Sequence, residues 1–225
     1  MELRFFEIYR HGDYLLILAE GLWVSFILTV LGAIVGFALA VGLSVARHAR
    51  NPLLRWVSAA YVELMRNTPL IVQMFFIAFG LPLLLDYHWP FWAHALLALA
   101  LNFSAYFAEI LRAGYQSIPS GQLECATALG LSPRIKFWRV VFPQAVAHMY
   151  PSLSSQFIFL FLTTGVISEI GTRDLTYAGA FIDSRTFRTF EVFMTLTVLY
   201  LLMSFGFKLA LKELQRFLFP WWKRS

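Results

Sequence analysis

The sequence predicts an all-α, polytopic membrane protein with five transmembrane helices and a short cytoplasmic helical element between the third and the fourth. Hydrophobic residues make up 59% of the chain and charged residues only 14%, whereas an ordinary soluble domain has about 25% charged residues. The apolar residues also gather in long stretches, and about 18 such residues in a row can cross a bilayer as a helix. The chain is therefore expected to lie mostly within a membrane.

Five stretches are expected to span, at residues 15–46, 69–85, 91–115, 144–168 and 192–214. The first is too long for a signal-peptide core and has no clear small-residue cleavage site, so we expect it to remain as a span. Gly32, Gly36 and Ala40 give it a small face that lets another helix approach closely. This division predicts an N-terminal segment at 1–14, one transmembrane domain at 15–214 and a C-terminal tail at 215–225.

The basic residues give the orientation of the spans. Thirteen of the 18 Lys and Arg residues fall on one side of the predicted membrane, and the side richer in Lys and Arg is normally cytoplasmic. The N-terminus is therefore expected outside the membrane and the C-terminus inside. Trp221 and Trp222 near the end suit an anchor at the cytoplasmic interface.

The segment between the first two spans carries signals for a helix and a break. Pro52 suits the first turn of a helix, and Pro69 disfavours helical geometry at the residue before it. We expect a short helix on or near the cytoplasmic surface, then a break, then the second span. Glu63 and Arg66 are three residues apart and could pair on one face of this helix.

The polar stretch before the fourth span predicts two short helices joined at a tight bend. Ser120 is a plausible cap for the first helix, and Gly130 is a natural stop because glycine accepts positive φ. Ser132 and the proline after it restart a helix, and Pro143 marks the entry to the fourth span. Such a rigid, solvent-facing element suits docking into a cleft of a partner.

The spacing in this stretch resembles the signature of the permease subunits of bacterial ATP-binding-cassette importers. That signature is Glu-Ala-Ala, three residues, Gly, nine residues and Ile-x-Leu-Pro. The chain has the same spacing with conservative changes: Glu124-Cys125-Ala126, Gly130, and Val140-x-Phe142-Pro143. The resemblance implies that Glu124, Ala126, Gly130 and Pro143 belong to a coupling helix that seats in an ATPase subunit.

Further stretches resemble the polar amino acid branch of these permeases. They are 63–73 (Glu-Leu-Met-Arg-Asn-Thr-Pro-Leu-Ile-Val-Gln), 101–114 (Leu-Asn-x-x-Ala-Tyr-x-x-Glu-x-x-Arg-x-Gly) and 118–122 (Ile-Pro-x-Gly-Gln). The resemblance implies the type I importer fold in the bacterial inner membrane. It also implies four partners: a cytoplasmic ATP-binding-cassette ATPase dimer, a second permease subunit (identical or homologous), an extracytoplasmic substrate-binding protein, and a polar amino acid as substrate. The amino acid itself, whether basic, acidic, amide or opine-like, is left open.

Polar residues within the spans are candidates for the substrate pathway, because burying them in a membrane is costly. The candidates are Gln73, Asn102, Thr163, Thr164 and Glu169. The amide of Asn102 could bind an amino acid, or could equally make a helix-packing hydrogen bond. Glu169 could attract substrate, or could lie at the outer interface where a carboxylate costs little. Glu109 and Arg112 are expected to pair near the cytoplasmic end of the third span.

The sequence lacks the motifs that several other functions require. No Gly-x-x-x-x-Gly-Lys-Ser/Thr loop is present, so ATP hydrolysis requires a partner. An intramembrane protease would need a nucleophile motif or paired carboxylates, and neither is found. A passive channel or an ion-driven transporter would have no need of the coupling stretch. No catalytic residue, metal site, cofactor or nucleic-acid partner is expected.

Overall fold

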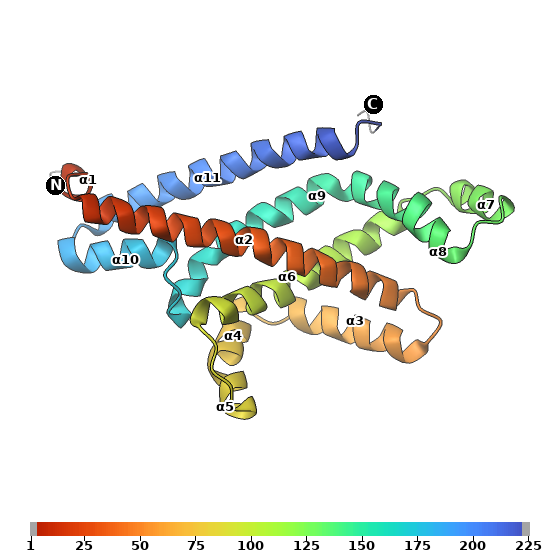
Figure 1. Cartoon of the computed structure of the whole chain (residues 1–225), viewed down its shortest axis with the longest axis horizontal. Helices are drawn as coiled ribbons and strands as arrows, with labels where there is room; N and C mark the ends of the chain where they lie inside the picture. Colours follow the sequence, from red (N-terminus) through yellow and green to blue (C-terminus); the bar gives the residue numbers. More distant parts are fainter. Residues whose placement is uncertain (1–3, 222–225) are drawn as a thin grey trace.

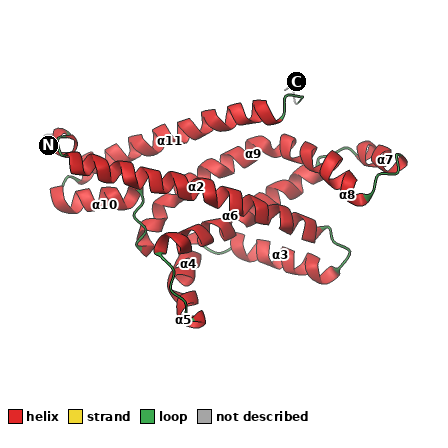
Figure 2. Cartoon of the chain, in the orientation of Figure 1, coloured by secondary structure: helices red, strands yellow, loops and turns green. Residues whose placement is uncertain are grey.

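The computed structural model describes residues 4–221, and these form helices joined by short loops (Figures 1 and 2). Four helical stretches are long and apolar enough to cross a membrane alone. They are α2 (Gly12–Arg47), α6 (Phe91–Gln116), the run Pro133–Ile170 that contains α9 (Phe142–Thr163), and α11 (Thr189–Leu218). A bent pair of helices supplies the fifth span, so the prediction of an all-α fold with five spans is confirmed.

A break falls where the sequence predicts it, but the helix before the break belongs to the second span, which therefore begins at Pro52 and not at residue 69. The second span consists of α3 (Pro52–Arg66), α4 (Leu70–Phe75), the π-helical turn η1 (Phe76–Gly80) and α5 (Leu81–Leu85). The two halves are bent by 107° at the break. Pro69 stands at the break with extended backbone, and as a proline it also disfavours helical geometry at Thr68 before it.

The expectation that α3 lies on or near the cytoplasmic surface is wrong. Its Tyr61 hydroxyl donates to the carbonyl oxygen of Leu101, in the middle of α6, at 2.9 Å. Its Ser58 hydroxyl donates to the carbonyl oxygen of Leu43 on α2, also at 2.9 Å. The face of α3 that carries Ser58 and Val62 is buried against α2 and α6, whereas Leu53, Val57 and Leu64 on its apolar face are half or more exposed. Asn51 caps the start of α3 by accepting from the backbone N–H of Leu53 at 2.9 Å.

The main core forms where α2 crosses α6. Gly32, Gly36 and Ala40 are all buried on the face of α2 that meets α6. A Cβ atom at Gly36 would lie 3.2 Å from the carbonyl oxygen of Ala100. The small face of the first span therefore does what the sequence predicts, bringing two helix backbones close together.

The fourth span is longer than the sequence suggests. Helical structure runs without interruption through α8 (Pro133–Ile135), the π-helical turn η2 (Lys136–Val141), α9 and the 3₁₀ turn η3 (Thr164–Ile170). A single helical run therefore joins the polar bend at one end of the molecule to the opposite end of the bundle (Figure 1).

A second, smaller core lies at the end of the molecule farthest from that bend (Figure 1). Here α10 (Leu175–Thr186) packs with α1 (Phe6–Tyr9) and with the first turns of α2 and α11. The buried side chains are apolar and come from all four helices: Ile8, Leu18, Leu175, Ala178, Ile182, Val192 and Leu196. The polar stretch between the last two spans thus contains a helix that the sequence does not predict.

The contact between α2 and the start of α10 depends on Gly21. A Cβ atom at Gly21 would lie 2.6 Å from the backbone carbonyl oxygen of Asp174, whereas one at Gly42 of the same helix would meet nothing within 4 Å. Gly21→Ala is therefore expected to destabilise the fold by about 1–3 kcal/mol through overpacking. Gly42→Ala, the matched control, should be neutral or stabilise by up to about 1 kcal/mol through helix propensity. Thermal unfolding in detergent checks this, and equal effects of the two substitutions would contradict the packing seen here.

Candidate coupling element and translocation path

The first helix of the predicted bend is α7 (Ser120–Ala128), and it ends at a glycine in the left-handed region. Gly130 has φ of 70°. Its N–H donates to the carbonyl oxygen of Thr127 at 2.9 Å, and the N–H of Leu131 donates to that of Ala126 at 3.2 Å. This pair of bonds is the Schellman arrangement that terminates helices, so the predicted stop at Gly130 is confirmed. The predicted cap is wrong: Ser120 is the first helical residue and Pro119 holds the cap position without a side-chain bond.

The second helix starts as predicted and is tied back to the first. Ser132 caps α8 by accepting from the N–H of Ile135 at 3.4 Å, and Pro133 occupies the first turn. The ammonium group of Lys136 donates to the Thr127 hydroxyl at 3.0 Å, which joins the two helices across the bend. The bend is therefore held by backbone and side-chain bonds on both of its arms.

This element presents a defined exposed tip. Leu129 is 77% exposed at the end of α7, and Glu124 and Cys125 are also exposed, whereas Ala126 is buried beneath them. An exposed leucine on a rigid turn is a feature that a partner surface can cover. Figure 1 shows α7 and α8 projecting together from one end of the bundle.

Aromatic side chains join the bend to the third and fourth spans. Phe137 lies between Tyr115 of α6, with ring centroids 5.7 Å apart, and Phe142 at the start of α9, at 6.0 Å. Pro143 is the second residue of α9 and directly follows the π-helical turn η2, so the N–H that it lacks is missing inside the continuous helical run. A displacement of α8 would be passed directly to α9, because the helical run from α8 to α9 is continuous.

The structure brings Asn102 and Gln73 together at the break in the second span. The Asn102 amide donates to the Gln73 side-chain oxygen at 2.9 Å and to the carbonyl oxygen of Met65 at 3.1 Å. The Gln73 amide donates to the carbonyl oxygens of Met65 at 3.0 Å and Thr68 at 3.2 Å. Asn102 is only 4% exposed. Both amides thus donate to carbonyls that the break leaves without helical partners. Of the two roles considered for Asn102, substrate binding and a helix-packing hydrogen bond, these contacts correspond to the second.

The other predicted pathway residues lie apart from this pair, at the far end of the fourth span. The Thr163 hydroxyl is half-buried and donates back to the carbonyl oxygen of Phe159 at 2.5 Å. The Thr164 hydroxyl is buried and donates to the carbonyl oxygen of Phe161 at 2.7 Å. Glu169 is exposed within η3. Of the five residues, Glu169 is exposed, Thr163 and Gln73 are half-buried, and Asn102 and Thr164 are buried.

The predicted pair of Glu109 and Arg112 is part of a larger cluster. The Arg112 guanidinium bonds to Glu109 Oε1, with its Nε at 2.9 Å. Glu109 Oε2 also lies 3.3 Å from Arg47 of α2 and 4.0 Å from Arg66 of α3. Arg66 therefore faces Glu109 rather than Glu63, which accepts a hydrogen bond from Asn67 at 3.0 Å. One carboxylate gathers three arginines from three helices, and sequence spacing could show only the one on its own helix.

The family of binding-protein-dependent transport system inner membrane components matches residues 38–224. The chain belongs to this family. The permease is 36% identical to the octopine transport system permease protein OccM of Rhizobium radiobacter over 197 residues, which cover 84% of this chain and 80% of that protein. It is 30% identical to the probable glutamine ABC transporter permease protein GlnM of Bacillus subtilis (strain 168) over 200 residues, covering 88% and 91% of the two chains.

Solved structures show the same fold. A chain from the crystal structure of an amino acid ABC transporter with histidines matches the permease with a TM-score of 0.86 and 31% identity, covering 96% of this chain and 99% of that one. A chain of the inward-facing MetNI methionine ABC transporter matches with a TM-score of 0.78 and 17% identity, a likeness of fold alone. The predicted family and the type I importer fold are confirmed, and the chain is a multi-pass inner-membrane permease subunit.

A buried carboxyl group of the permease was not singled out by its sequence. Asp174 is fully buried and caps α10 by accepting from the N–H of Tyr177 at 2.9 Å. Burial raises the pKa of the Asp174 carboxyl to about 6, against the opposing effect of the backbone amides of Tyr177 and Thr176. A lone Asp before a helix predicts a cap, but its burial depends on α2 passing close by at Gly21.

The packing role of Asn102 can be tested by comparing its substitution with that of Asn67, an exposed asparagine at the same break. Asn102→Leu keeps the branched shape of the side chain but removes the donor to the partly buried Gln73 oxygen, so we expect a loss of about 1–3 kcal/mol in the free energy of unfolding. The matched control is Asn67→Leu, which should change stability by less than about 0.5 kcal/mol. Thermal unfolding in detergent measures both. Unchanged stability of Asn102→Leu together with lost transport would instead indicate a direct substrate contact.

The raised pKa of Asp174 predicts a stability that falls with pH. The folded state holds this proton more tightly than the unfolded state, so stability is highest below about pH 4 and declines as pH rises through about 6. Asp174→Asn retains a cap acceptor and cannot ionise. We expect it to stabilise the permease at pH 8 by on the order of 1–3 kcal/mol, with the gain lost near pH 4.

Unfolding midpoints at the two pH values measure the effect of Asp174→Asn. Asp174→Ala is the control, because it removes the cap and should lose about 1 kcal/mol relative to Asp174→Asn at both pH values. A gain of equal size at pH 4 and pH 8 would contradict the ionisation argument.

Proposed function

We propose that this permease, with a second permease subunit, forms the pathway of an importer that moves a polar amino acid across the bacterial inner membrane. A cytoplasmic pair of ATP-binding-cassette ATPase subunits drives the cycle, and an extracytoplasmic binding protein delivers the substrate. The observation that carries the proposal is the exposed element of α7, Gly130 and α8, which is rigid in itself and continuous with the fourth span.

The proposed orientation places this element in the cytoplasm. Basic residues gather at the ends of α2, α6 and α11 that lie toward α7 and α8 (Figure 1) and in the element itself, as they do on the cytoplasmic side of membrane proteins: Arg47, Arg112, Lys208, Lys212, Arg216, Arg134, Lys136 and Arg139. The N-terminal segment 1–14 is then outside, the transmembrane domain is 15–214, and the tail 215–225 is inside. Glu124, Ala126, Gly130 and Pro143 belong to the coupling element in this proposal.

A mechanical link follows from the helical run between α8 and η3. When the ATPase subunits close, α7 and α8 move with them, and α9 follows because no loop separates it from α8. The junction of Thr163 and Thr164, where α-helix changes to 3₁₀ helix, is the point at which this motion is proposed to alter access to the outer side. The cluster around Glu109 ties Arg47 and Arg66, the last residues of α2 and α3, to the second half of α6 during the movement.

The substrate class is inferred from the relatives. They are named for octopine, cystine and glutamine, and all three substrates carry an amino acid's carboxylate and amine. Thr163 and Glu169 are the accessible polar residues proposed to meet such a solute, with Thr164 beneath them. Gln73 and Asn102 are proposed to act on the pathway by fixing the break in the second span.

A pair of substitutions at Gly130 tests the coupling proposal. Gly130→Val places a β-branched side chain at φ of 70°, where it is strained by about 1–2 kcal/mol, whereas Gly130→Asn accepts that geometry more readily. In proteoliposomes with the ATPase and binding protein, Gly130→Val should reduce ATP-dependent uptake roughly tenfold, and Gly130→Asn should retain most of it. Uptake is measured as labelled amino acid retained in the vesicle lumen.

Association with the ATPase serves as the second readout. Gly130→Val should insert normally and co-purify less ATPase, because the tip of α7 is displaced. If Gly130→Val retains full association and full uptake, the coupling proposal fails. If uptake proceeds without any ATPase, the permease would have to be an ion-driven transporter.

A further inference from the structure

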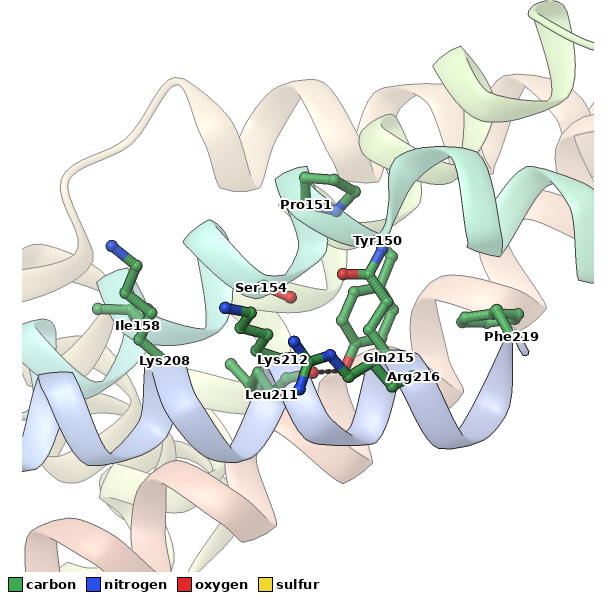
Figure 3. A pocket seen from close by; sticks show the side chains of 10 residues that line it. All are labelled: Tyr150, Pro151, Ser154, Ile158, Lys208, Leu211, Lys212, Gln215, Arg216 and Phe219. Carbon is green, nitrogen blue, oxygen red and sulfur yellow. Dashed lines mark hydrogen bonds between the residues drawn. The ribbon is translucent and has the colours of Figure 1, made fainter. Parts of the chain in front are cut away.

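A groove lies between α9 and α11, on the same end of the molecule as α7 and α8 (Figures 1 and 3). Its cavity volume is about 510 Å³. The Tyr150 hydroxyl donates to the carbonyl oxygen of Leu211 at 2.8 Å and so ties the two helices together across the floor of the groove. Pro151 lies inside α9 at this level and cannot donate a backbone hydrogen bond. Neither the coupling element nor the proposed pathway residues take part in this groove.

Three basic side chains line the groove from one face of α11. Lys208, Lys212 and Arg216 follow each other at four-residue intervals, a spacing that stacks side chains along a helix. Arg216 pairs with Glu213 at 2.6 Å. Neither lysine has an ion pair with any residue in 4–221, and no Asp or Glu in that range lines the groove. The positive charge of the two lysines is therefore available to a ligand.

The remaining walls combine apolar and polar groups. Ile158 and Leu211 supply aliphatic surface, and Ser154 and Gln215 supply hydrogen-bonding groups. A free phosphate ion would use the lysines and leave the aliphatic wall in water. A molecule that has both a phosphate and a hydrocarbon chain satisfies the two parts of the groove at once.

The groove also lies where lipid headgroups are expected. Phe217 and Trp221, near the end of α11, are 81% and 53% exposed, and exposed aromatic residues at a helix end mark the membrane interface. Lysine stems can lie along apolar surface while their ammonium groups reach the headgroup layer. Basic pockets between transmembrane helices on the cytoplasmic side are known to suit anionic lipid headgroups.

We propose that the groove between α9 and α11 binds an anionic phospholipid of the cytoplasmic leaflet. Its phosphate contacts Lys208 and Lys212, and one acyl chain lies along Ile158 and Leu211. The leaflet follows from the proposed orientation of the permease, whereas the binding itself does not depend on transport. Because the lipid bridges the fourth and fifth spans, it would hold α11 against the helix that carries the coupling motion.

The test uses the transporter assembled with its partner subunits and purified in detergent. Phosphatidylglycerol is titrated in, and bound lipid is counted by native mass spectrometry, with phosphatidylcholine of the same acyl chains as the neutral lipid. The variant is Lys208→Gln with Lys212→Gln, which leaves the Arg216–Glu213 pair in place. The matched control is Arg50→Gln with Arg55→Gln, which removes two exposed cations of the same end of the molecule outside the groove.

Wild type is expected to retain phosphatidylglycerol in preference to phosphatidylcholine. The lysine variant should bind it roughly 25-fold more weakly, about fivefold for each cation removed, and the arginine control should bind it as wild type does. Unchanged binding by the lysine variant would overturn the proposal, as would an equal loss in the control. Displacement of the lipid by millimolar inorganic phosphate would show a phosphate site without lipid recognition, which also overturns it.

Discussion

A polypeptide in a bilayer has to bond every backbone N–H and C=O group within the protein, and the architecture of this permease follows from that constraint. Helices satisfy it without help. The sharp break between α3 and α4 does not, since its carbonyls lose their helical partners. The amides of Asn102 and Gln73 supply donors to Met65 and Thr68 at that point. These two side chains let the second span bend by 107° within the bundle.

Contacts between distant segments also fix the two ends of the molecule. At one end, Glu109 draws together arginines from α2, α3 and α6, which fixes the helices around the point where the coupling element emerges. At the other end, Gly21 lets α2 touch the backbone before α10, and this contact buries Asp174. The helical run from α8 to η3 joins the two ends. A displacement of α8 can therefore reach the opposite end of the molecule without passing through a loop.

Much of this could be predicted from the sequence, because the signals are local. Long apolar stretches predict the spans, Gly130 predicts the end of α7, and the four-residue spacing of Gly32, Gly36 and Ala40 predicts a close helix contact. What the sequence could not show depends on packing between distant segments. The burial of α3, the arginines that Glu109 gathers from other helices, and the meeting of Asn102 with Gln73 all require the folded arrangement. Among the candidate residues, spacing alone could not separate those that hold the break from those that a solute can reach.

The proposed contact between an ATPase and the tip of α7 can be measured with a residue that the chain already carries. Cys125 is the only cysteine in the sequence, and it is exposed on α7. The direct measurement is the rate at which a maleimide labels Cys125 in the permease with and without its ATPase partner. A Cys125→Ala variant with a cysteine at exposed Arg185, at the opposite end of the molecule, gives the control rate. If an ATPase covers this tip, assembly should slow labelling of Cys125 at least about tenfold and leave the control rate unchanged. Equal rates at Cys125 in the free and assembled permease would contradict the proposed contact.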